Sequence, residues 1–473
     1  MNNEHHVCLL LEGSYPYITG GVSSWVHQLI KSIPELKFSL FTISPKKNME
    51  LNYQLPENVV GHHNVVINDI VSGKKMDKKR ENAVFDQIKV IHKSFKANSN
   101  PDLNHLFSLI KEGDYLHRLA VLHDIGWKML LEGNAKKNPI YAFADYFWAW
   151  KSAHDMMFKV IASDIPKADL YHAVSTGYAG LVGIVAKIRY EKPLILTEHG
   201  LYHKEREMEI KRASYVKGYQ RDMWIQIYNK ISQMVYQYSD KIITLFELNR
   251  KKEIELGALN EKTIVIPNGI DVMKFTSVKR QKRPGFHVGL VGRVVPIKDI
   301  KTFIISCKII LDMIPGSKFY CIGPDDEDIN YFNECQILVE RLKLNDSFEF
   351  TGTKNVMDYY TFLDVVMLTS VREAQPLVIL EAYAAGVPVV ATRVGNIPEL
   401  LDYDERLLAS PKDPEKLAQN VKWIFDHPSL LRDLIDRNKL KVVKFYDRQE
   451  VFRAYYELYR SIAIQGIDSK TRE

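Results

Sequence analysis

The sequence has only four cysteines, and they form no pattern that holds a metal or a disulfide framework. Cys8, Cys307, Cys321 and Cys335 contain neither a C-x-x-C pair nor a Cys/His spacing typical of zinc. All four lie in or beside apolar stretches, which is typical of reduced thiols in the core of a cytosolic protein. We therefore expect no metal held by cysteine.

Long apolar runs are also missing. No stretch approaches the roughly eighteen apolar residues of a membrane-spanning helix. The N-terminus, MNNEHHVCLLLEGSYP, has a short apolar run with no basic segment before it, which does not fit a signal peptide. We expect a cytoplasmic protein whose membrane contact, if any, is peripheral and at the inner face of the cell membrane.

The chain also lacks a strong excess of positive or negative charge. The net charge of +6 and the isoelectric point near 8.7 are too mild to indicate a nucleic-acid partner, so none is expected. This balance suits an anionic small ligand or an acidic membrane surface. With 473 residues, of which 46% are hydrophobic, the chain is long enough for two or three domains with full cores.

Two series of alternating apolar strands and amphipathic helices predict an α/β protein with two doubly wound, Rossmann-like domains. The first series occupies residues 1–275 and opens with a buried strand at 7–11. A loop ending in Gly20-Gly21 and a helix with one apolar face follow. Between about 62 and 160 the alternation stops and aromatic-rich helical patterns replace it, which indicates a helical insertion.

The second series covers residues 284–445 and begins with a strand at 286–291. The basic segment KRQKR at 279–283 lies between the two series, and we interpret it as a solvated linker. Residues 446–473 contain a last helix rich in Tyr and Phe. Because doubly wound sheets bind ligands at the carboxyl ends of their strands, we expect the two domains to face a common cleft.

Two loops that follow predicted strands have the composition of an anion site. Gly21 lies between a strand and a helix, where backbone N–H groups can approach an anion, although a flexible turn is the alternative. In the second series Arg293 and Lys298 share a strand-to-helix loop. A guanidinium beside an ammonium makes a strong site for a diphosphate, and an ordinary basic loop is the alternative.

Two carboxylates frame the stretch SVREAQPLVILEAYAAGVPVVAT at 370–392. Glu373 lies in a polar loop, and Glu381 lies on the apolar helix that follows, before a buried strand at 389–391. A carboxylate on so apolar a helix is costly to desolvate unless a partner satisfies it. That partner is either a pair of ligand hydroxyls or, within the protein, a backbone cap or an arginine.

One histidine stands at a position where a ligand is expected. His199 follows a predicted strand at 193–197, in the sequence Glu198-His199-Gly200. Open α/β sheets place their ligands at the carboxyl ends of their strands, so His199 is a candidate site residue. A structural histidine with satisfied hydrogen bonds is the alternative.

Three segments together resemble the retaining GT-B glycosyltransferases of family 4, the glycosyl transferases group 1. They are GRVVPIK at 292–298, EAQPLVILEA at 373–382 and PNGID at 267–271, and Glu373 and Glu381 match the E-x7-E spacing. GGVSSWVHQLI, TEHGLYHKERE and REAQPLV are more specifically similar to the Pel exopolysaccharide glycosyltransferases. The resemblance covers nearly the whole chain and is weakest in 62–150.

The resemblance implies a role for each candidate residue of the second domain. Arg293 and Lys298 would hold the nucleotide diphosphate and stabilise the charge that develops on the leaving group. Glu381 would accept hydrogen bonds from both ribose hydroxyls, and Glu373 would contact the donor sugar. In the same loop Ala374 and Gln375-Pro376 depart from the residues common in the family.

Backbone groups and the first domain would complete the site. The N–H groups of Leu377 and Val378 would face the phosphates, and a loop around Val356 would receive the base. Gly21 would approach the diphosphate or the acceptor, and His199 would lie near the donor sugar and the reacting centre. The last helix would cross back onto the first domain, as the resemblance implies.

The same resemblance implies the substrates and the chemistry. The donor would be UDP-glucose or a related UDP-sugar, and a hexose or N-acetylhexosamine would pass to a growing exopolysaccharide, with retention and without a cofactor or metal. A D-x-D sequence at 326–328 is therefore interpreted as an acidic turn. Because export of a polymer needs a membrane partner, we expect peripheral association with inner-membrane polysaccharide export proteins.

Two other functions fit the same fold. A UDP-sugar epimerase, or a phosphorylase with a pyridoxal cofactor, would use a similar pair of domains, but no clear cofactor-lysine motif is present. A non-catalytic scaffold of a secretion complex would bind a UDP-sugar without turning it over. The presence of Arg293, Lys298, Glu373 and Glu381 argues against the scaffold.

Overall fold

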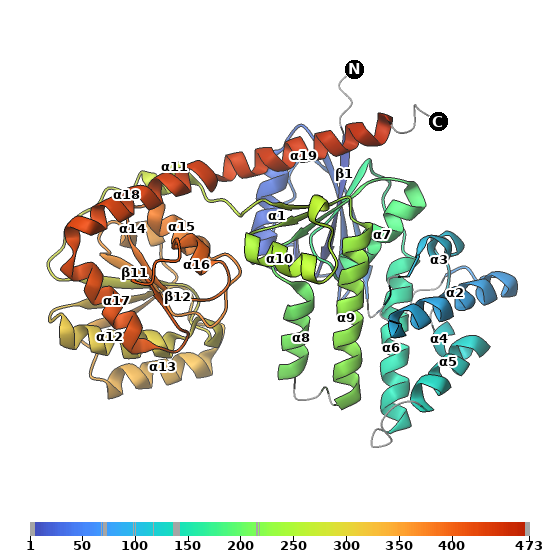
Figure 1. Cartoon of the computed structure of the whole chain (residues 1–473), viewed down its shortest axis with the longest axis horizontal. Coiled ribbons are helices and arrows are strands. Elements are labelled where there is room, and N and C mark those ends of the chain that lie inside the picture. Colours follow the sequence, from blue (N-terminus) through green and yellow to red (C-terminus); the bar gives the residue numbers. More distant parts are fainter. Residues whose placement is uncertain are drawn as a thin grey trace. The chain divides into compact units, whose positions relative to one another are not determined.

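A computed structural model describes residues 5–468 except 68, 70–72, 98, 100, 117, 136–141, 214–215 and 217. The chain divides into two compact units, one formed by Met1–Ile266 with Phe452–Glu473 and the other by Pro267–Val451. Each unit contains a parallel β-sheet flanked by helices (Figure 1). The prediction of an α/β protein with two doubly wound units is confirmed.

The first unit is built on a seven-stranded sheet of order β3-β2-β1-β4-β5-β6-β7, in which every pair is parallel. Its central strands are apolar and fully buried, which explains their unbroken apolar runs in the sequence. The strands are β1 (His6–Glu12), β2 (Lys37–Ser44), β3 (Val59–Val66), β4 (Leu170–Ala173), β5 (Leu194–Glu198), β6 (Lys241–Thr244) and β7 (Thr263–Val265). The helices outside the insertion are α1 (Gly21–Ser32), α7 (Tyr178–Tyr190), α8 (Tyr202–Arg212), α9 (Gly218–Tyr238) and α10 (Glu247–Glu255).

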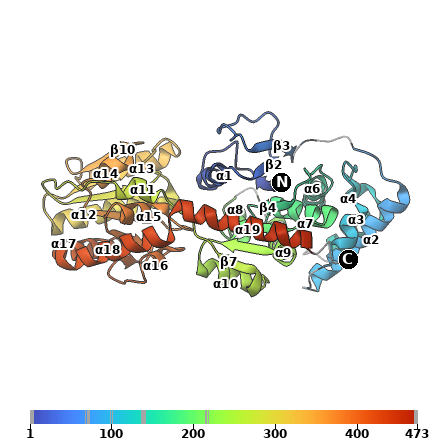
Figure 2. The same ribbon diagram turned by 90° about the horizontal axis from the view of Figure 1, so that it is seen from above.

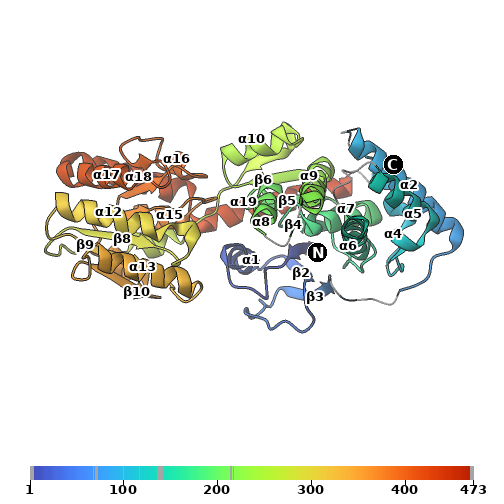
Figure 3. The ribbon, with the colours of Figure 1, turned by 90° about the horizontal axis from the view of Figure 1, so that it is seen from below.

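The helical insertion lies between β3 and β4 and consists of α2 (Lys78–Lys96), α3 (Asn104–Leu109), α4 (Leu119–Leu122), α5 (Asp124–Ala135) and α6 (Phe143–Ile161). Figures 2 and 3 show α2 to α5 gathered beside the sheet of this unit. Its apolar side chains join the core of the first unit through residues such as Phe85 and Leu130. The insertion starts later than predicted, because 59–66 form β3. That edge strand is half exposed, so VVGHHNVV lacks a clear strand pattern.

The second unit is built on a six-stranded parallel sheet of order β10-β9-β8-β11-β12-β13. Its strands are β8 (His287–Val291), β9 (Lys318–Ile322), β10 (Phe348–Gly352), β11 (Val365–Leu368), β12 (Val389–Thr392) and β13 (Leu408–Ala409). Its helices are α11 (Val272–Thr276), α12 (Ile300–Met313), α13 (Ile329–Arg341), α14 (Val356–Tyr360), α15 (Leu377–Ala384), α16 (Ile397–Leu400), α17 (Pro414–Asp426) and α18 (Pro428–Phe445). The short elements β13 and α16 have no counterpart in the sequence prediction.

The last helix, α19 (Arg448–Asp468), returns to the first unit, in agreement with the prediction. The hydroxyl of Tyr459 lies 2.6 Å from Nδ1 of His172 on β4. The ring of Tyr455 meets Trp25 of α1 edge-on, with 5.3 Å between the ring centroids. The Tyr-rich face of this helix is therefore core. No helix in the described part of the chain is long and apolar enough to cross a membrane.

The basic segment at 279–283 is exposed, as predicted, but it does not link the two units, contrary to the sequence interpretation. The chain enters the second unit at Pro267, and the segment packs on that unit. The guanidinium of Arg280 donates to the carbonyl oxygens of Tyr360 and Leu363. Arg283 lies over the ring of Phe362, 3.6 Å from its centroid. The composition was misleading because arginine can satisfy backbone carbonyls and cover aromatic rings while its charge remains near solvent.

Candidate functional site

The predicted site residues of the second unit lie where the strand order of the sheet reverses. The chain runs from β8 outward through β9 and β10, and then returns to β11 on the other side of β8. The strand order therefore reverses between β8 and β11, and such a switch point is where doubly wound sheets bind ligands. The loop after β8 carries Arg293 and Lys298, and the loop after β11 carries Glu373.

Hydrogen bonds hold these two loops against each other. The hydroxyl of Thr369, just after β11, donates to the carbonyl oxygen of Lys298 at 2.8 Å. The N–H of Val371 donates to the carbonyl oxygen of Ile297 at 2.9 Å. The side chains on the two loops are therefore presented from a braced backbone.

Lys298 and Glu373 form an ion pair, although the sequence did not identify them as partners. The distance from Nζ to Oε1 is 2.5 Å, and the side chains are only 20% and 13% exposed. The hydroxyl of Ser370 donates to the same carboxylate oxygen at 2.6 Å. Because the pair is largely enclosed, losing one partner would leave the other charge poorly compensated. A diphosphate bound here would compete with Glu373 for the ammonium.

Arg293 is paired with the acidic turn that the sequence presented as a D-x-D motif. Its guanidinium donates to both oxygens of Glu327, at 2.8 and 2.7 Å, and each side chain is about half exposed. Asp328 caps α13 by accepting from the N–H of Tyr331. An exposed ion pair contributes only about 0–1 kcal/mol, so Arg293 can exchange Glu327 for a phosphate at little cost.

Glu381 is a half-buried carboxylate on α15, and the hydroxyl of Tyr360 lies close enough to act on it as a hydrogen-bond donor. Burial raises the pKa of its carboxyl to about 7, and the charge of Lys274 and the Tyr360 hydroxyl only partly oppose this. The hydroxyl of Tyr360 is buried and has no other hydrogen-bond partner among the described residues. The sequence analysis left a backbone cap or an arginine open as partners of Glu381 within the protein. The structure shows neither of them among the described residues.

The start of α15 leaves its first N–H groups available. No side chain caps this helix, and Leu377 and Val378, its first two residues, are half-buried. Uncapped N–H groups at a helix start are suited to an anion. The prediction that Val356 lies in a loop is wrong. Val356 is the first residue of α14, and its side chain packs against the core of the second unit.

Gln375, which departs from the family pattern, has a structural role in this chain. Its side chain is buried, and its Oε1 accepts a hydrogen bond from the N–H of Asn268 at 2.8 Å. The loop after β11 is thereby fastened to the PNGID segment at 267–271. Sequence analysis missed this contact, because no local pattern links two residues so far apart in the chain.

Gly395, in the loop after β12, was also missed. Its φ is +53°, and a Cβ built there would lie 1.9 Å from the carbonyl oxygen of Glu373. The N–H of the next residue, Asn396, donates to the carbonyl oxygen of Ala374 at 2.9 Å. This loop therefore supports the backbone of the Glu373 loop, and only glycine fits at 395.

We expect Gly395→Ala to lower the free energy of unfolding by about 3 kcal/mol, because the new Cβ clashes with backbone that cannot move freely. Gly316→Ala is the control. Its φ is +84°, but a Cβ there meets nothing within 4 Å, so only the backbone strain of about 1 kcal/mol is expected. Urea denaturation compares the two variants, and equal losses would show that the Glu373 loop is not held by this contact.

In the first unit, Gly21 begins α1, as the sequence predicted, and Gly20 precedes it as the N-cap. No side chain caps this helix, and a Cβ added at either glycine would meet nothing within 4 Å. The space before the helix is therefore open, and its first N–H groups can face an anion.

His199 follows β5 at the predicted position and is half-buried. Its ring meets Trp25 of α1 edge-on, with 4.5 Å between centroids. Burial lowers the pKa of His199 to about 4, so the imidazole is neutral near pH 7. Its Nε2 is buried and has no hydrogen-bond partner among the described residues. The structure thus shows a neutral ring with one unused nitrogen.

A buried pair of carboxyl groups supports the end of β5, and sequence analysis missed it. Glu198 accepts hydrogen bonds from the Tyr236 hydroxyl at 2.5 Å and the Tyr202 N–H at 2.9 Å. Glu253 of α10 is fully buried beside it, and burial raises the pKa of both carboxyl groups. Because Glu198 has the donors, it carries the charge and Glu253 holds the proton.

Comparison with known families identifies the class of the protein. Residues 285–427, within the second unit, match the family profile of the glycosyl transferases group 1. Together with two doubly wound units, this match defines a glycosyltransferase of the GT-B fold. Residues 5–261 match the profile described as domain of unknown function (DUF3492). The chain belongs to the DUF3492 family, whose profile covers more than half of it.

Individual relatives agree with this class. The chain is 23% identical over 300 residues to a D-inositol 3-phosphate glycosyltransferase of Saccharomonospora viridis, covering 60% of this chain and 68% of that protein. It is 30% identical over 238 residues to an N-acetyl-alpha-D-glucosaminyl L-malate synthase of Bacillus anthracis, covering 50% of this chain and 55% of that protein. The chain thus spans about half to two thirds of the length of these relatives.

Solved structures show the same fold along nearly the full chain. Anabaena HepE in complex with UDP and glucose superposes with a TM-score of 0.59 at 15% identity, over 97% of this chain and 100% of that one. A sucrose-phosphate synthase of Thermosynechococcus elongatus superposes with a TM-score of 0.59 at 17% identity, over 97% and 99%. At such low identity the likeness shows the fold alone.

Proposed function

We propose that the protein is a retaining glycosyltransferase that moves a hexose or an N-acetylhexosamine from a UDP-sugar, such as UDP-glucose, to a growing glycan. Glu381 carries this proposal. Its carboxylate is half-buried at a switch point, has a raised pKa and has the single hydroxyl of Tyr360 as a donor from the protein. A carboxylate accepts several hydrogen bonds, so two ribose hydroxyls would supply further donors. The complexes of HepE with UDP and with UDP-glucose support the choice of nucleotide.

The reaction requires stabilisation of the departing UDP. The bond between the anomeric carbon and the β-phosphate oxygen breaks, and a bond from that carbon to an acceptor oxygen forms on the same face of the sugar. The proton of the acceptor hydroxyl passes to the departing phosphate. Lys298 and Arg293 would stabilise the negative charge that develops on the phosphates, assisted by the N–H groups of Leu377 and Val378.

The remaining candidate residues would bind and orient the substrates. Once the diphosphate competes for Lys298, the Glu373 carboxylate is free to accept hydrogen bonds from the donor sugar. His199, which is neutral, would use its free Nε2 to hydrogen-bond near the reacting centre rather than to exchange protons. Gly21 would let the backbone before α1 approach the diphosphate or the acceptor, and Val356 would lie near the base at the start of α14.

No metal is needed in this proposal, because Arg293 and Lys298 provide the positive charge. We expect initial rates of UDP release to be unchanged, within about 20%, after incubation with excess EDTA and gel filtration. The check is a colorimetric UDP assay with and without added Mg²⁺ or Mn²⁺. Loss of activity in EDTA with recovery in Mn²⁺ would contradict this part of the proposal.

The biological setting that we propose is synthesis of a Pel-type exopolysaccharide in the manner of PelF, in the cytoplasm. The segments GGVSSWVHQLI and TEHGLYHKERE support it by their similarity to that family. In that setting the protein would associate peripherally with inner-membrane export proteins. Co-purification of the tagged protein with those candidate partners from detergent extracts tests this, and a wholly unbound protein would contradict it.

The test of the proposed function is product analysis with a panel of UDP-sugars. With a donor and a glycan acceptor, we expect UDP together with a product whose new linkage has the anomeric configuration of the donor, as seen by NMR. Interconversion of UDP-sugars without UDP release would indicate an epimerase instead. Binding of UDP without release of UDP from any UDP-sugar would indicate the scaffold.

A further inference from the structure

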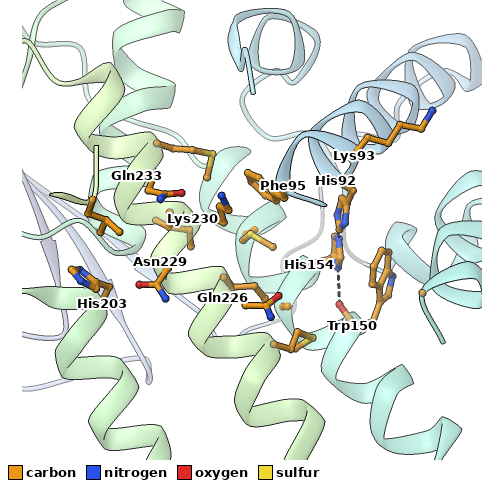
Figure 4. A pocket seen from close by; sticks show the side chains of 18 of the residues that line it. His92, Lys93, Phe95, Trp150, His154, His203, Gln226, Asn229, Lys230 and Gln233 are labelled. Atoms are coloured by element: carbon orange, nitrogen blue, oxygen red, sulfur yellow. Dashed lines mark hydrogen bonds between the residues drawn. The ribbon is translucent and has the colours of Figure 1, made fainter. Parts of the chain in front are cut away.

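The first unit contains a large cavity that none of the site residues described above lines. Its volume is about 1150 Å³, and it lies between α9, α8 and the helices α2, α5 and α6 of the insertion. In Figure 4 the labelled side chains of α9 lie between His203 of α8 on one side and Phe95 and His154 on the other.

The face of α9 toward this cavity carries both apolar and polar side chains. Gln226, Asn229, Lys230 and Gln233 line the cavity, and their spacing of i, i+3, i+4 and i+7 places them on one face. Four apolar residues of the same helix line it beside them: Met223, Ile227, Ile231 and Met234. Three amides and one ammonium among apolar side chains indicate a ligand with both polar and apolar parts.

Two polar atoms on the cavity wall have no partner in the described structure. The Oε1 atom of Gln233 and the Nδ1 atom of His203 are buried without a hydrogen bond. His203 is only 5% exposed, and burial lowers its pKa to about 4, so its ring is neutral. An unpaired buried polar group costs about 1–3 kcal/mol, so small side-chain rotations that bring either atom to a ligand hydroxyl would be favoured.

The cavity wall is mildly basic, with five lysines and two glutamates among its lining residues. Lys204 and Lys252 are paired with Glu207 and Glu255, at 3.1 and 2.9 Å. In Figure 4 the side chain of Lys93 points away from the α9 side chains. The neutral amides and imidazoles beside these lysines are suited to a ligand with hydroxyl groups.

The opposite wall is apolar and aromatic. It includes Phe95, Trp150, Met129 and Met157, and the ring of His154 covers Trp150 with 4.1 Å between centroids. A ligand that fits must therefore offer hydroxyls to one side and C–H groups to the other. Sugar rings have this character, because their hydroxyls project around a ring whose faces carry C–H groups.

We propose that this cavity holds sugar units of the acceptor glycan, an inference that rests on the proposed glycosyltransferase function. Each amide of Gln226, Asn229 and Gln233 both donates and accepts hydrogen bonds, as sugar hydroxyls do. Leu201 and His203 of the cavity wall directly follow His199 in the chain. A glycan seated along α9 would therefore extend from the segment that carries the reacting-centre histidine.

The test uses the double variant Asn229→Leu/Gln233→Leu in the full chain. Leucine is similar in size to both residues, so the cavity stays filled while its hydrogen-bonding groups are lost. Gln237→Leu, on an exposed position of the same helix outside the cavity, is the matched control. Thermal denaturation of all proteins shows that they are folded.

The probe is the oligosaccharide that the wild-type protein itself makes from the UDP-sugar selected by UDP release, isolated and returned as acceptor. The readout is the ratio of sugar transfer to hydrolysis of the UDP-sugar at fixed acceptor. We expect the double variant to lower this ratio at least tenfold and to raise the acceptor KM by a similar factor. The Gln237→Leu control keeps the wild-type ratio.

The possible failures are distinguishable. If the wild-type protein transfers no sugar at all, the proposed function fails. If the wild type transfers sugar and the folded double variant keeps its ratio and its acceptor KM, the cavity proposal alone is overturned. A lipid found by mass spectrometry in the wild type and lost from the double variant, with an unchanged acceptor KM, would assign the cavity to a lipid and also overturn the proposal.

Discussion

Replacing Lys298 with methionine is expected to lower the kcat of UDP-sugar turnover by roughly 10²- to 10³-fold, the loss typical of removing one preorganised charge-stabilising donor. The ammonium lies 2.5 Å from Glu373, and its loop is braced by Thr369, so its position is fixed before the ligand binds. The charge that it stabilises develops only as UDP departs. The effect should therefore appear in kcat more than in the donor KM.

Two further variants separate this effect from damage to the fold. Lys298→Met leaves the enclosed Glu373 carboxylate without its cation, which lowers stability. The double variant Lys298→Met/Glu373→Gln removes that charge as well and should recover stability without recovering turnover. Lys301→Met, an exposed lysine paired with Glu334, is the control and should keep wild-type kcat. Near wild-type turnover in folded Lys298→Met would refute the assigned role.

The second large effect is expected for Glu381→Gln, which should weaken UDP binding at pH 8 by roughly 10- to 100-fold. Ionised, the carboxylate accepts charge-assisted hydrogen bonds, which contribute about 1.5–3 kcal/mol each, whereas an amide offers one neutral acceptor. Isothermal titration with UDP measures the loss. Gln237→Leu in the first unit is expected to bind UDP like the wild type, and equal affinity of Glu381→Gln and wild type would contradict the ribose contact.

The pH dependence of UDP binding gives a more specific signature of the same carboxylate. Burial raises the pKa of Glu381 to about 7 in the unbound protein, so below that pH the group must lose a proton to accept from ribose hydroxyls. Affinity should therefore rise with pH up to about 7 and then level off, by up to about tenfold per pH unit. The phosphate of UDP titrates in the same range. Its contribution is the pH dependence that remains in Glu381→Gln, and subtracting it from the wild-type curve leaves the contribution of Glu381.

Stability should show the opposite trend. The folded pKa of Glu381 lies above its unfolded value, so the folded state binds more protons between pH 4.5 and 7. The free energy of unfolding therefore falls as pH rises through this window. Glu381→Gln removes this fall and should be more stable than the wild type at pH 8, on the order of 2 kcal/mol. A residue that costs stability but is needed for binding is typical of functional sites.

Much of the fold could be predicted from the sequence because the central strands of both sheets are buried on both faces. Such strands read as short apolar runs between loops and amphipathic helices, as at 7–11 and 286–291. The half-exposed edge strand β3 and the two-residue strand β13 lack this signature and were missed. Local pattern thus reveals the centre of a sheet better than its edges.

The basic segment at 279–283 shows a second limit. Its composition predicts a solvated linker, and the segment is exposed, but Arg280 and Arg283 also contact carbonyl oxygens and the ring of Phe362 within the second unit. Those partners lie about eighty residues further along the chain. Which partner an arginine finds is decided by tertiary structure, and composition alone could not predict it.

For the candidate site, the sequence predicted the positions of the residues better than their contacts. Lys298, Glu373 and Glu381 follow predicted strands, and the structure places all three in the second unit's carboxyl-edge loops and helix. Their roles in binding remain predictions. The pairing of Lys298 with Glu373, the support from Gly395 and the anchoring by Gln375 depend on neighbouring strands coming together. These contacts had no local signal.

The cavity beside α9 could not be predicted from sequence for the same reason. Gln226, Asn229 and Gln233 read as an exposed polar face, since a polar stripe on a helix normally faces water. Only the packing of the insertion opposite this face of α9 turns the stripe into a cavity wall. The insertion is therefore the part of the chain where structure adds most to the functional account.

The most direct test of the central claim is UDP release from a panel of UDP-sugars by the purified full-length protein, in the presence of a glycan acceptor. The account predicts release from at least one UDP-hexose or UDP-N-acetylhexosamine, reduced at least a hundredfold in Lys298→Met. Absence of UDP release from every donor, in a protein that binds UDP in a Glu381-dependent manner, would contradict the claim that it is a glycosyltransferase acting on UDP-sugars.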